Sequence, residues 1–297
     1  SRDWSSDVCS SDLFRYAPVA SLEEALALKA EHGDEAKFLA GGQSLIPAMN
    51  FRMAQPAVLI DINPLAALSY VKQDGNVTRI GALTRYRTLQ RDAAIAGKVT
   101  LMAEALPEVA HPAIRNRGTL GGNLSHADPA SELPAVVLAL GGTLHARSKK
   151  GARQIAARDF FTAALTTALA DDELLTEIEL PVLPPRSGTC FLEVARRRGD
   201  YAMMGVACTV TLDANGDCSE ARLAYCNAGE TAMLAPKAAQ ILKGQRLADA
   251  TARAAADAAK GEVRPFGNVH ASADYQRHLA GVLTRRALLA AAERARA

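Results

Sequence analysis

The sequence predicts an α+β protein of two units, and three observations lead to this prediction. At roughly 150 residues per domain, a chain of 297 residues holds about two domains. The segment 181–188, PVLPPRSG, has the proline-rich composition of a linker. Beyond it, a pair of strands is followed by alanine-rich helices, the order in which an α+β unit covers one face of its sheet. Hydrophobic residues make up 49% of the chain, which is enough for an ordinary buried core.

The first unit combines strands with helices whose ends can be recognised. Ser21 and Glu24 form a capping box, which predicts that a helix begins directly after Ser21, and Gly33 ends this helix. The turn Asp74-Gly75-Asn76 lies between two apolar segments, 68–71 and 77–80, and predicts a β-hairpin. The other strands expected in this unit are 14–18, 37–39, 58–60 and 174–180, and the other helices are 101–109 and 134–140.

The second unit is expected to contain a strand pair and two helices. Residues 206–212 and 221–225 have the composition of strands and flank a turn that contains Gly216. Alanine-rich helices are expected over 235–260 and from 273 to the end.

The first residues do not fit either unit. Residues 1–13, SRDWSSDVCSSDL, have neither a helical nor a strand period. They also lack the basic region and the apolar run of a secretory signal. We therefore expect a non-native segment at 1–13 and assign no fold to it.

Charge and cysteine spacing exclude several classes of function. The 34 basic and 32 acidic residues leave a net charge of +2, so neither a nucleic acid nor an anionic membrane is an expected partner. No apolar run approaches the roughly 20 residues that cross a bilayer. The five cysteines stand singly, which argues against a disulfide framework, a zinc site or an iron–sulfur cluster on this chain. We assign no metal ligands and expect reduced thiols and a cytoplasmic location.

Two glycine-rich segments carry the chemistry, and the first directly follows a strand. Paired glycines allow positive φ angles and remove the Cβ atoms that keep an anion away from the backbone. Successive N–H groups in such a turn form an anion-binding nest, although a plain turn has the same composition. The pattern matches neither the Rossmann fingerprint nor the P-loop. The segment consists of Ala40, Gly41, Gly42, Gln43, Ser44 and Leu45.

The second segment, 115–129, has the sequence RNRGTLGGNLSHADP. Its glycines can present backbone amides to a pyrophosphate, and carboxylates follow at Asp128 and Glu132 to accept from ribose hydroxyls. An elaborate surface loop is the alternative, but so polar a loop needs an external reason to stay ordered. Two such segments suit a dinucleotide whose pyrophosphate lies between two lobes.

In this order and spacing, the two segments resemble the FAD-binding medium subunits of the molybdenum hydroxylases, the family of xanthine and carbon monoxide dehydrogenases. The resemblance covers about residues 14–291. It also includes IGALT at 80–84, ARRRGDYA at 195–202 and HASADYQRHL at 270–279.

The resemblance implies a fold and a cofactor. It implies an FAD-binding domain of the vanillyl-alcohol-oxidase (PCMH) type over 14–181, in two lobes of 14–72 and 73–181. A smaller α+β domain like that of the CO dehydrogenase flavoprotein would follow over 187–292. FAD would be held non-covalently, with Tyr201 beside the isoalloxazine ring, where an aromatic face suits stacking; a half-buried strand aromatic is the alternative for this residue. By motif match, the FAD-binding residues are Ala40, Gly41, Gly42, Gln43, Ser44, Leu45, Thr84, Thr119, Gly121, Gly122, Asn123, Asp128, Glu132, Leu175 and Tyr201.

One residue departs from the family pattern. Relatives commonly carry a lysine where this chain has Glu193. A carboxylate disfavours an anionic reduced flavin, so Glu193 is not assigned as a cofactor ligand. No catalytic residue is assigned either, and His126 is expected to be a hydrogen-bonding loop histidine.

The function implied is electron transfer within a larger enzyme. A large subunit with molybdopterin would oxidise the substrate, and a small subunit with a [2Fe–2S] centre would relay electrons to the FAD of this chain. The FAD would pass them to NAD⁺, a quinone or another acceptor, in a dimer of heterotrimers. The alternatives are a stand-alone FAD-dependent oxidoreductase of the same fold and a flavin-binding assembly module.

Overall fold

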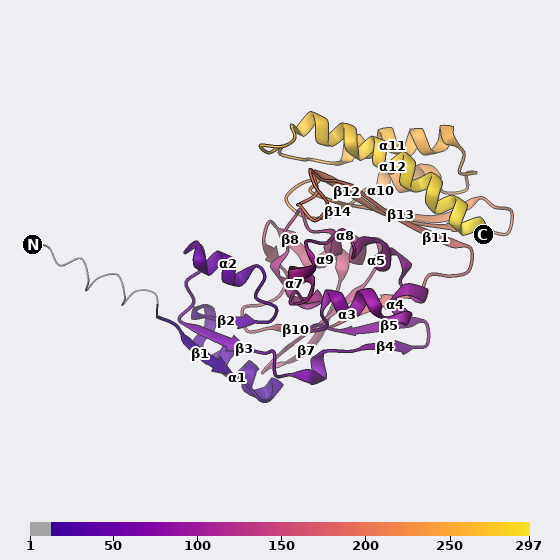
Figure 1. Ribbon diagram of the computed structural model, residues 1–297. Helices are drawn as coiled ribbons and strands as arrows, with labels where there is room; N and C mark the ends of the chain where they lie inside the picture. The colour runs from indigo at the N-terminus through magenta and orange to yellow at the C-terminus, as the bar shows by residue number, and fades with distance from the viewer. Residues whose placement is uncertain (1–12) are drawn as a thin grey trace, which may run out of the picture.

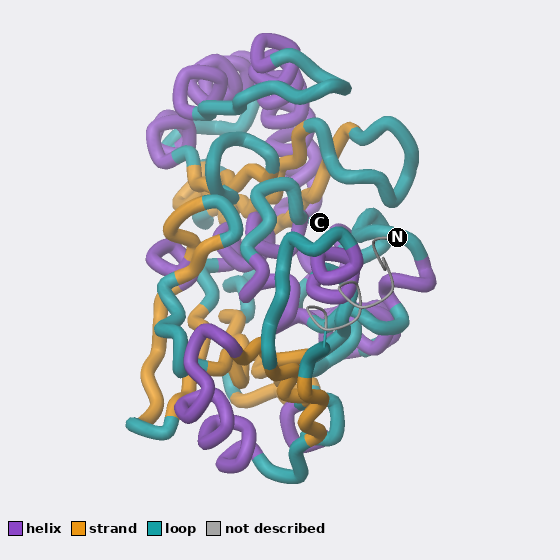
Figure 2. The backbone as a smooth tube through the Cα atoms, turned by 90° about the vertical axis from the view of Figure 1, so that its left-hand side faces the viewer, coloured by secondary structure: helices purple, strands orange, loops and turns teal. Residues whose placement is uncertain are grey.

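The computed structural model describes residues 13–297, so apart from Leu13 the segment expected to be non-native lies outside the described residues. Helical and sheet layers alternate through the molecule (Figure 1). From the C-terminal side they are helices, a four-stranded sheet, further helices and a five-stranded sheet, and the alternation is also visible after a quarter turn (Figure 2). A three-stranded sheet forms a separate lobe near the N-terminus. The expected α+β class is confirmed.

The N-terminal lobe is a parallel sheet with the strand order β1-β3-β2, and helix α1 packs on it. Ser21 caps the helix as expected, because the Glu24 N–H donates to Ser21 Oγ at 3.1 Å. The Glu24 carboxylate accepts from the Ala20 N–H at 2.8 Å, one residue before the N-cap residue. Gly33 ends the helix with a φ of 50°. The elements are β1 (Arg15–Pro18), α1 (Leu22–His32), η1 (Gly33–Glu35), β2 (Ala36–Leu39), α2 (Leu45–Asn50), β3 (Val58–Asp61) and η2 (Ala66–Leu68).

The second lobe is an antiparallel sheet with the strand order β4-β5-β10-β6-β7. Ile178 and Leu180 of the central strand β10 are buried in a core shared with helix α8. Side chains alternate along a strand, so Glu177 and Glu179 lie on the opposite face. The strands are β4 (Val71–Asp74), β5 (Val77–Gly81), β6 (Thr143–Ser148), β7 (Gly151–Ala156) and β10 (Leu174–Pro181), with a small pair β8 (Phe161–Ala163) and β9 (Thr166–Thr167). The helices are α3 (Tyr86–Arg91), α4 (Ala93–Lys98), α5 (Thr100–Ala105), α6 (Pro112–Arg115), α7 (Leu120–His126), α8 (Glu132–Leu140) and α9 (Ala157–Phe160).

The boundary between the lobes falls earlier than we expected. Strand β4 pairs with β5 from Val71 onward, so the last residues assigned to the first lobe belong to the second sheet. The hairpin between these strands turns at Gly75, whose φ is 57°. Strand β10 joins the two lobes, because Leu174 is buried in the core of the first and Leu175 in the core of the second.

The C-terminal part is an antiparallel sheet with the strand order β11-β12-β13-β14. One face packs under helices α10 to α12, and the other face packs on α5 and α8. The prediction of continuous helix over 235–260 is wrong. The chain forms two helices separated by 243–248, where Gly244 has a φ of 73°. The elements are β11 (Ser187–Val194), β12 (Met204–Leu212), β13 (Cys218–Cys226), β14 (Met233–Leu234), α10 (Pro236–Leu242), α11 (Asp249–Glu262) and α12 (Ala273–Arg296).

Candidate functional site

The first glycine segment, which we call loop one (residues 40–45), connects β2 to α2. Gly42 has a φ of 71°, a left-handed conformation that favours glycine. The Gly42 carbonyl accepts from the Ile46 N–H at 3.1 Å, which starts the turn into α2. Within the described part of the chain, the N–H groups of the residues from Gly41 to Leu45 donate no hydrogen bond. Loop one therefore presents a run of unused backbone donors, which suits an anion.

Residues 117–123 of the second glycine segment, which we call loop two, include the first turn of helix α7. Loop two differs from loop one in its backbone contacts. The Leu120 N–H donates to the Thr84 carbonyl at 3.0 Å, and the Gly121 N–H donates to the Ala82 carbonyl at 2.8 Å. The Gly122 N–H donates to Thr119 Oγ1 at 3.2 Å. These amides are engaged within the protein, contrary to our expectation that they face a pyrophosphate. A role for loop two in binding stays a prediction. Its side chains would make the contacts, and its glycines would allow a ligand to approach the backbone closely.

The two loops touch each other. A Cβ atom on Gly41 would overlap the Arg117 carbonyl oxygen and lie 2.9 Å from Gly118 Cα. Arg85 ties the loops together, because its guanidinium donates to the Arg117 carbonyl and to Asn63 Oδ1. Asn63 Nδ2 in turn donates to the Ala40 carbonyl at 2.7 Å.

Burial and the charge of Arg117 lower the pKa of Arg85. Two guanidinium groups thus lie near each other at the junction of the loops. Sequence reasoning missed Asn63 and Arg85, since neither belongs to a glycine motif. Only the arginines of 115–117 indicated positive charge at this junction.

A second junction joins the end of α7 to the C-terminal domain. The Asn227 N–H donates to the Pro129 carbonyl at 2.6 Å, and Asn227 Nδ2 donates to the Ala202 carbonyl at 2.7 Å. This bridge places Asp128 close to Tyr201. Burial of the hydroxyl and the Asp128 carboxylate raise the pKa of Tyr201 to about 12, although 69% of the residue is exposed. Tyr201 is therefore an accessible aromatic side chain near Asp128, and the alternative of a half-buried strand aromatic is wrong.

Carboxyl groups gather beside this junction. Glu132 is 5% exposed, and burial followed by the charges of Asp128 and Glu108 raises its pKa to about 7. Burial and the charges of Glu132 and Glu108 raise the pKa of Glu193 to about 8. Glu193 Oε2 is buried without a hydrogen-bond partner in the described chain. Glu193, which the sequence did not assign as a cofactor ligand, thus lies near Glu132 and Glu108.

Besides Glu132, the predicted site residues Thr84, Thr119 and Leu175 are buried inside the protein. Thr84 is fully buried, and its Oγ1 exchanges hydrogen bonds of 3.0 Å with the backbone N–H and carbonyl of Tyr70. Leu175 is 2% exposed and packs in the core of the second lobe. The contact of Thr84 and Leu175 with a cofactor stays a prediction.

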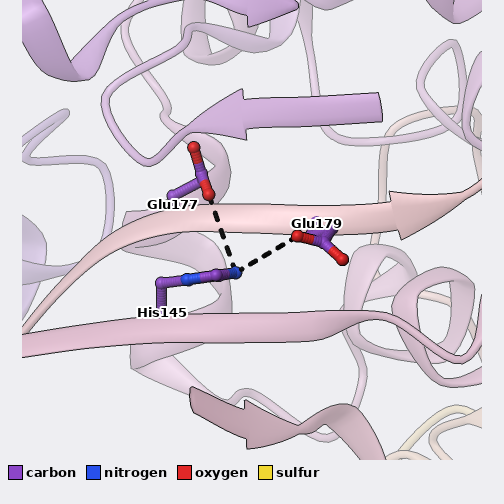
Figure 3. A group of neighbouring side chains, drawn as sticks. All are labelled: His145, Glu177 and Glu179. Atoms are coloured by element: carbon purple, nitrogen blue, oxygen red, sulfur yellow. Dashed lines mark ion pairs between the residues drawn. The ribbon is translucent and has the colours of Figure 1, made fainter. Parts of the chain in front are cut away.

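A separate polar cluster lies on the outer face of the five-stranded sheet (Figure 3). His145 Nε2 lies 3.6 Å from an oxygen of Glu177 and 3.6 Å from an oxygen of Glu179. These are metal-ligating residue types, but Arg79 Nη1 lies 2.8 Å from the same two carboxylate oxygens. The guanidinium already supplies the cation, so we do not assign a metal to the cluster.

The comparisons with known proteins place this geometry in a family. A family model described as the FAD binding domain in molybdopterin dehydrogenase matches residues 12–183, and one described as the CO dehydrogenase flavoprotein C-terminal domain matches 189–291. The chain is 42% identical over 283 residues to the alpha subunit of the 6-hydroxypseudooxynicotine dehydrogenase complex of Paenarthrobacter nicotinovorans, covering 95% of this chain and 96% of that protein.

It is 39% identical over 280 residues to the nicotine 6-hydroxylase medium subunit of the same organism, covering 94% and 98%. The solved structure of carbon monoxide dehydrogenase from Hydrogenophaga pseudoflava matches with a TM-score of 0.92 at 36% identity, covering 95% of this chain and 98% of that one. The chain belongs to the FAD-binding medium subunits of the molybdenum hydroxylases.

For this medium subunit, the expected family, the two-domain fold and the oxidoreductase class are confirmed. FAD is the cofactor of its larger family domain. In the described part of the chain, no helix is both long enough and apolar enough to cross a membrane.

The residues present in this medium subunit fit FAD. Loop one offers the unused backbone donors that a pyrophosphate requires, and the adjacent Arg85 and Arg117 add positive charge. Tyr201 offers an exposed aromatic face. The donors suit the central pyrophosphate of FAD, and the aromatic face suits its isoalloxazine ring.

Proposed function

We propose that this medium subunit takes electrons from an iron–sulfur partner subunit, holds them on FAD and passes them to NAD⁺, a quinone or another acceptor. The observation that carries the proposal is loop one, whose free N–H groups lie against loop two and are fixed there by Arg85 and Asn63. The names of relatives as medium subunits or as subunits of a dehydrogenase complex support a multi-subunit enzyme.

The residues of the chain divide the work of holding the cofactor. Bound FAD supplies the capacity to accept electrons one or two at a time. Loop one would bind the pyrophosphate through its N–H groups and the Ser44 hydroxyl. Tyr201 would cover the flavin ring, and Asn227 would keep Tyr201 and Asp128 together. We propose 14–181 as the FAD-binding domain, 187–292 as the domain that covers its flavin end, and non-covalent binding through the full set named from the sequence.

The partners follow from the same proposal. A large molybdopterin subunit and a small [2Fe–2S] subunit would complete the enzyme as a dimer of heterotrimers in the cytoplasm. The described cysteines are buried free thiols with raised pKa values, which suits a chain that leaves cluster binding to a partner.

The test is to purify the chain with its co-expressed partner chains and record the absorption spectrum before and after addition of the reducing substrate. We expect a flavin band that bleaches only when the iron–sulfur partner is present. Bleaching of the isolated chain by a small organic substrate would favour the stand-alone oxidoreductase. Bound FAD that neither NADH nor the partners reduce would favour the assembly module, and no binding after addition of FAD would overturn the proposal.

A further inference from the structure

Glu193 lies at the seam between the FAD-binding domain and the C-terminal domain. It pairs with Gly205 on β12, which pairs with Cys226 on β13. A Cβ on Gly205 would lie 3.3 Å from Glu193 Cβ and 2.5 Å from Cys226 Sγ, so these side chains share one face of the sheet. Cys226 belongs to the core shared with helix α8, whose first residue is Glu132. The sheet therefore directs Glu193 toward Glu132.

No cation neutralises this pair of carboxyl groups. In the described chain, no arginine, lysine or histidine lies within 4.0 Å of the carboxyl oxygens of Glu132 or Glu193. The nearby arginines are engaged elsewhere: Arg197 pairs with Asp200 at 3.5 Å, and Arg198 with Glu108 at 3.3 Å. Arg196 lies 3.3 Å from His270 Nδ1. The other ionisable groups near the pair are Glu108 after α5, Asp128 after α7, Cys226 on β13, Tyr86 on α3 and Tyr201.

Charged carboxylates that are buried together without a cation are costly, so the pair keeps a proton. The contrast with Glu177 and Glu179 is direct, because Arg79 contacts both of those residues at 2.8 Å. Glu193 Oε2 is buried and makes no hydrogen bond in the described chain. It is an unused polar atom at the edge of the site.

Solvent reaches this edge. Glu193 and Glu108 line an open hollow of about 450 Å³, with Arg196, Arg197 and Arg198 on its rim. Glu132 acts electrostatically on both Glu193 and Tyr201, so the carboxyl pair adjoins the end of the site where Tyr201 would cover the flavin. The pair is therefore connected to water on one side and to the site on the other.

We propose that Glu132 and Glu193 form a proton-accepting pair that holds one proton while the bound flavin is oxidised and takes up a second proton from water when the flavin is reduced. This inference rests on the proposed function, since it needs the flavin ring at the Tyr201 end.

Reduction of bound flavin with two electrons from the reductant and one proton from water would place one more negative charge beside the pair. That charge raises the proton affinity of the adjacent carboxylate, which binds a further proton arriving through the hollow. Reoxidation releases both protons.

The first measurement needs no cofactor. The folded chain keeps a proton on Glu193 that the unfolded chain releases above the ordinary carboxyl pKa of 4.5. The stability that this proton contributes is therefore full below pH 4.5 and is lost as the pH rises through the pKa of Glu193 in the folded chain, about 8. We expect the unfolding midpoint of the FAD-free chain to fall by about 5 °C more between pH 5.5 and 9 than that of Glu193→Gln. Glu230→Gln, an exposed control, should behave like the unchanged chain. Equal changes of the unfolding midpoint with pH in all three proteins would overturn the proposal that the two carboxyl groups share a proton.

The second measurement reduces the FAD-loaded chain with dithionite at pH 7.5 and counts the protons taken up with an indicator dye. The unchanged chain and Glu230→Gln should take up one proton more per flavin than Glu193→Gln and Glu132→Gln. Equal uptake in all four would overturn the proposal. Failure of the chain to bind FAD would instead overturn the proposed function, and the cofactor-free profile would still decide whether the pair exists.

Discussion

Loop one and loop two each contain a Gly-Gly pair, but glycine has a different purpose in each. In loop one, Gly42 adopts a positive φ and the N–H groups of the loop are left without protein acceptors. In loop two, Gly121 lies against Ala82, and the N–H groups are engaged. The difference teaches that a glycine pair either exposes the backbone to a ligand or lets two segments pack closely. Substitutions can separate these purposes. Those in loop one should change the affinity for FAD, and those in loop two should change the free energy of unfolding.

The largest expected effect is on loop two. In Gly121→Ala, the new methyl group would overlap Ala82 Cβ and lie 2.8 Å from the Ala82 carbonyl oxygen. Overpacking against a fixed backbone costs about 2 kcal/mol of unfolding free energy, measured by thermal unfolding of the FAD-free chain. The control is Gly97→Ala in helix α4, where no atom lies within 4 Å and stability should hold or rise slightly. Equal stability of the two variants would contradict the packing role.

A smaller effect is expected at the residue that joins the loops. In Arg85→Lys the charge remains, but one ammonium cannot span both Asn63 Oδ1 and the Arg117 carbonyl as the guanidinium does. We expect a loss of about 1.5 kcal/mol in unfolding free energy and weaker FAD binding in titration calorimetry. Arg91→Lys, an exposed position at the end of α3, is the control. If affinity were unchanged while stability fell, the arginine would support the fold only.

The smallest effect on stability is expected in loop one. Gly42→Ala places a side chain at a φ of 71° and should cost about 1 kcal/mol of unfolding free energy. Gly244→Ala, at a φ of 73° with open space around it, pays the same conformational cost. Only Gly42→Ala should weaken FAD binding, by about tenfold, because it disturbs the unused donors. Equal FAD affinities for the two variants would remove loop one from the binding site.

Sequence was informative wherever the signal was local. The helix cap at Ser21 and the turn at Gly75 depend on residues a few positions apart, and both formed where expected. Strands β6 and β7 were missed, because Thr143–Ser148 and Gly151–Ala156 alternate with charged residues and lack a clear apolar pattern. The two helices in 235–260 were merged because alanine is helical on both sides of Gly244.

The sequence likewise predicted the local features of the site but not the contacts between distant segments. The glycine motifs marked both loops, but not which of them has free donors, since Thr84 and Ala82 accept from loop two across the fold. Asn63, Arg85 and Asn227 act between segments that are distant in sequence, and no spacing rule points to them. Glu193 stood out only as a departure from the family, and its lack of a cation became visible when the sheet placed it beside Glu132.

Strand β10 has a consequence for how this protein is made. It occupies the centre of the five-stranded sheet, between β5 and β6, yet it is the last strand of that sheet to leave the ribosome. Until residues 174–181 are translated, β5 and β6 each present an unpaired edge, and such edges attract other chains. A chain that ends before Leu174 should therefore aggregate more readily than one that continues through β10.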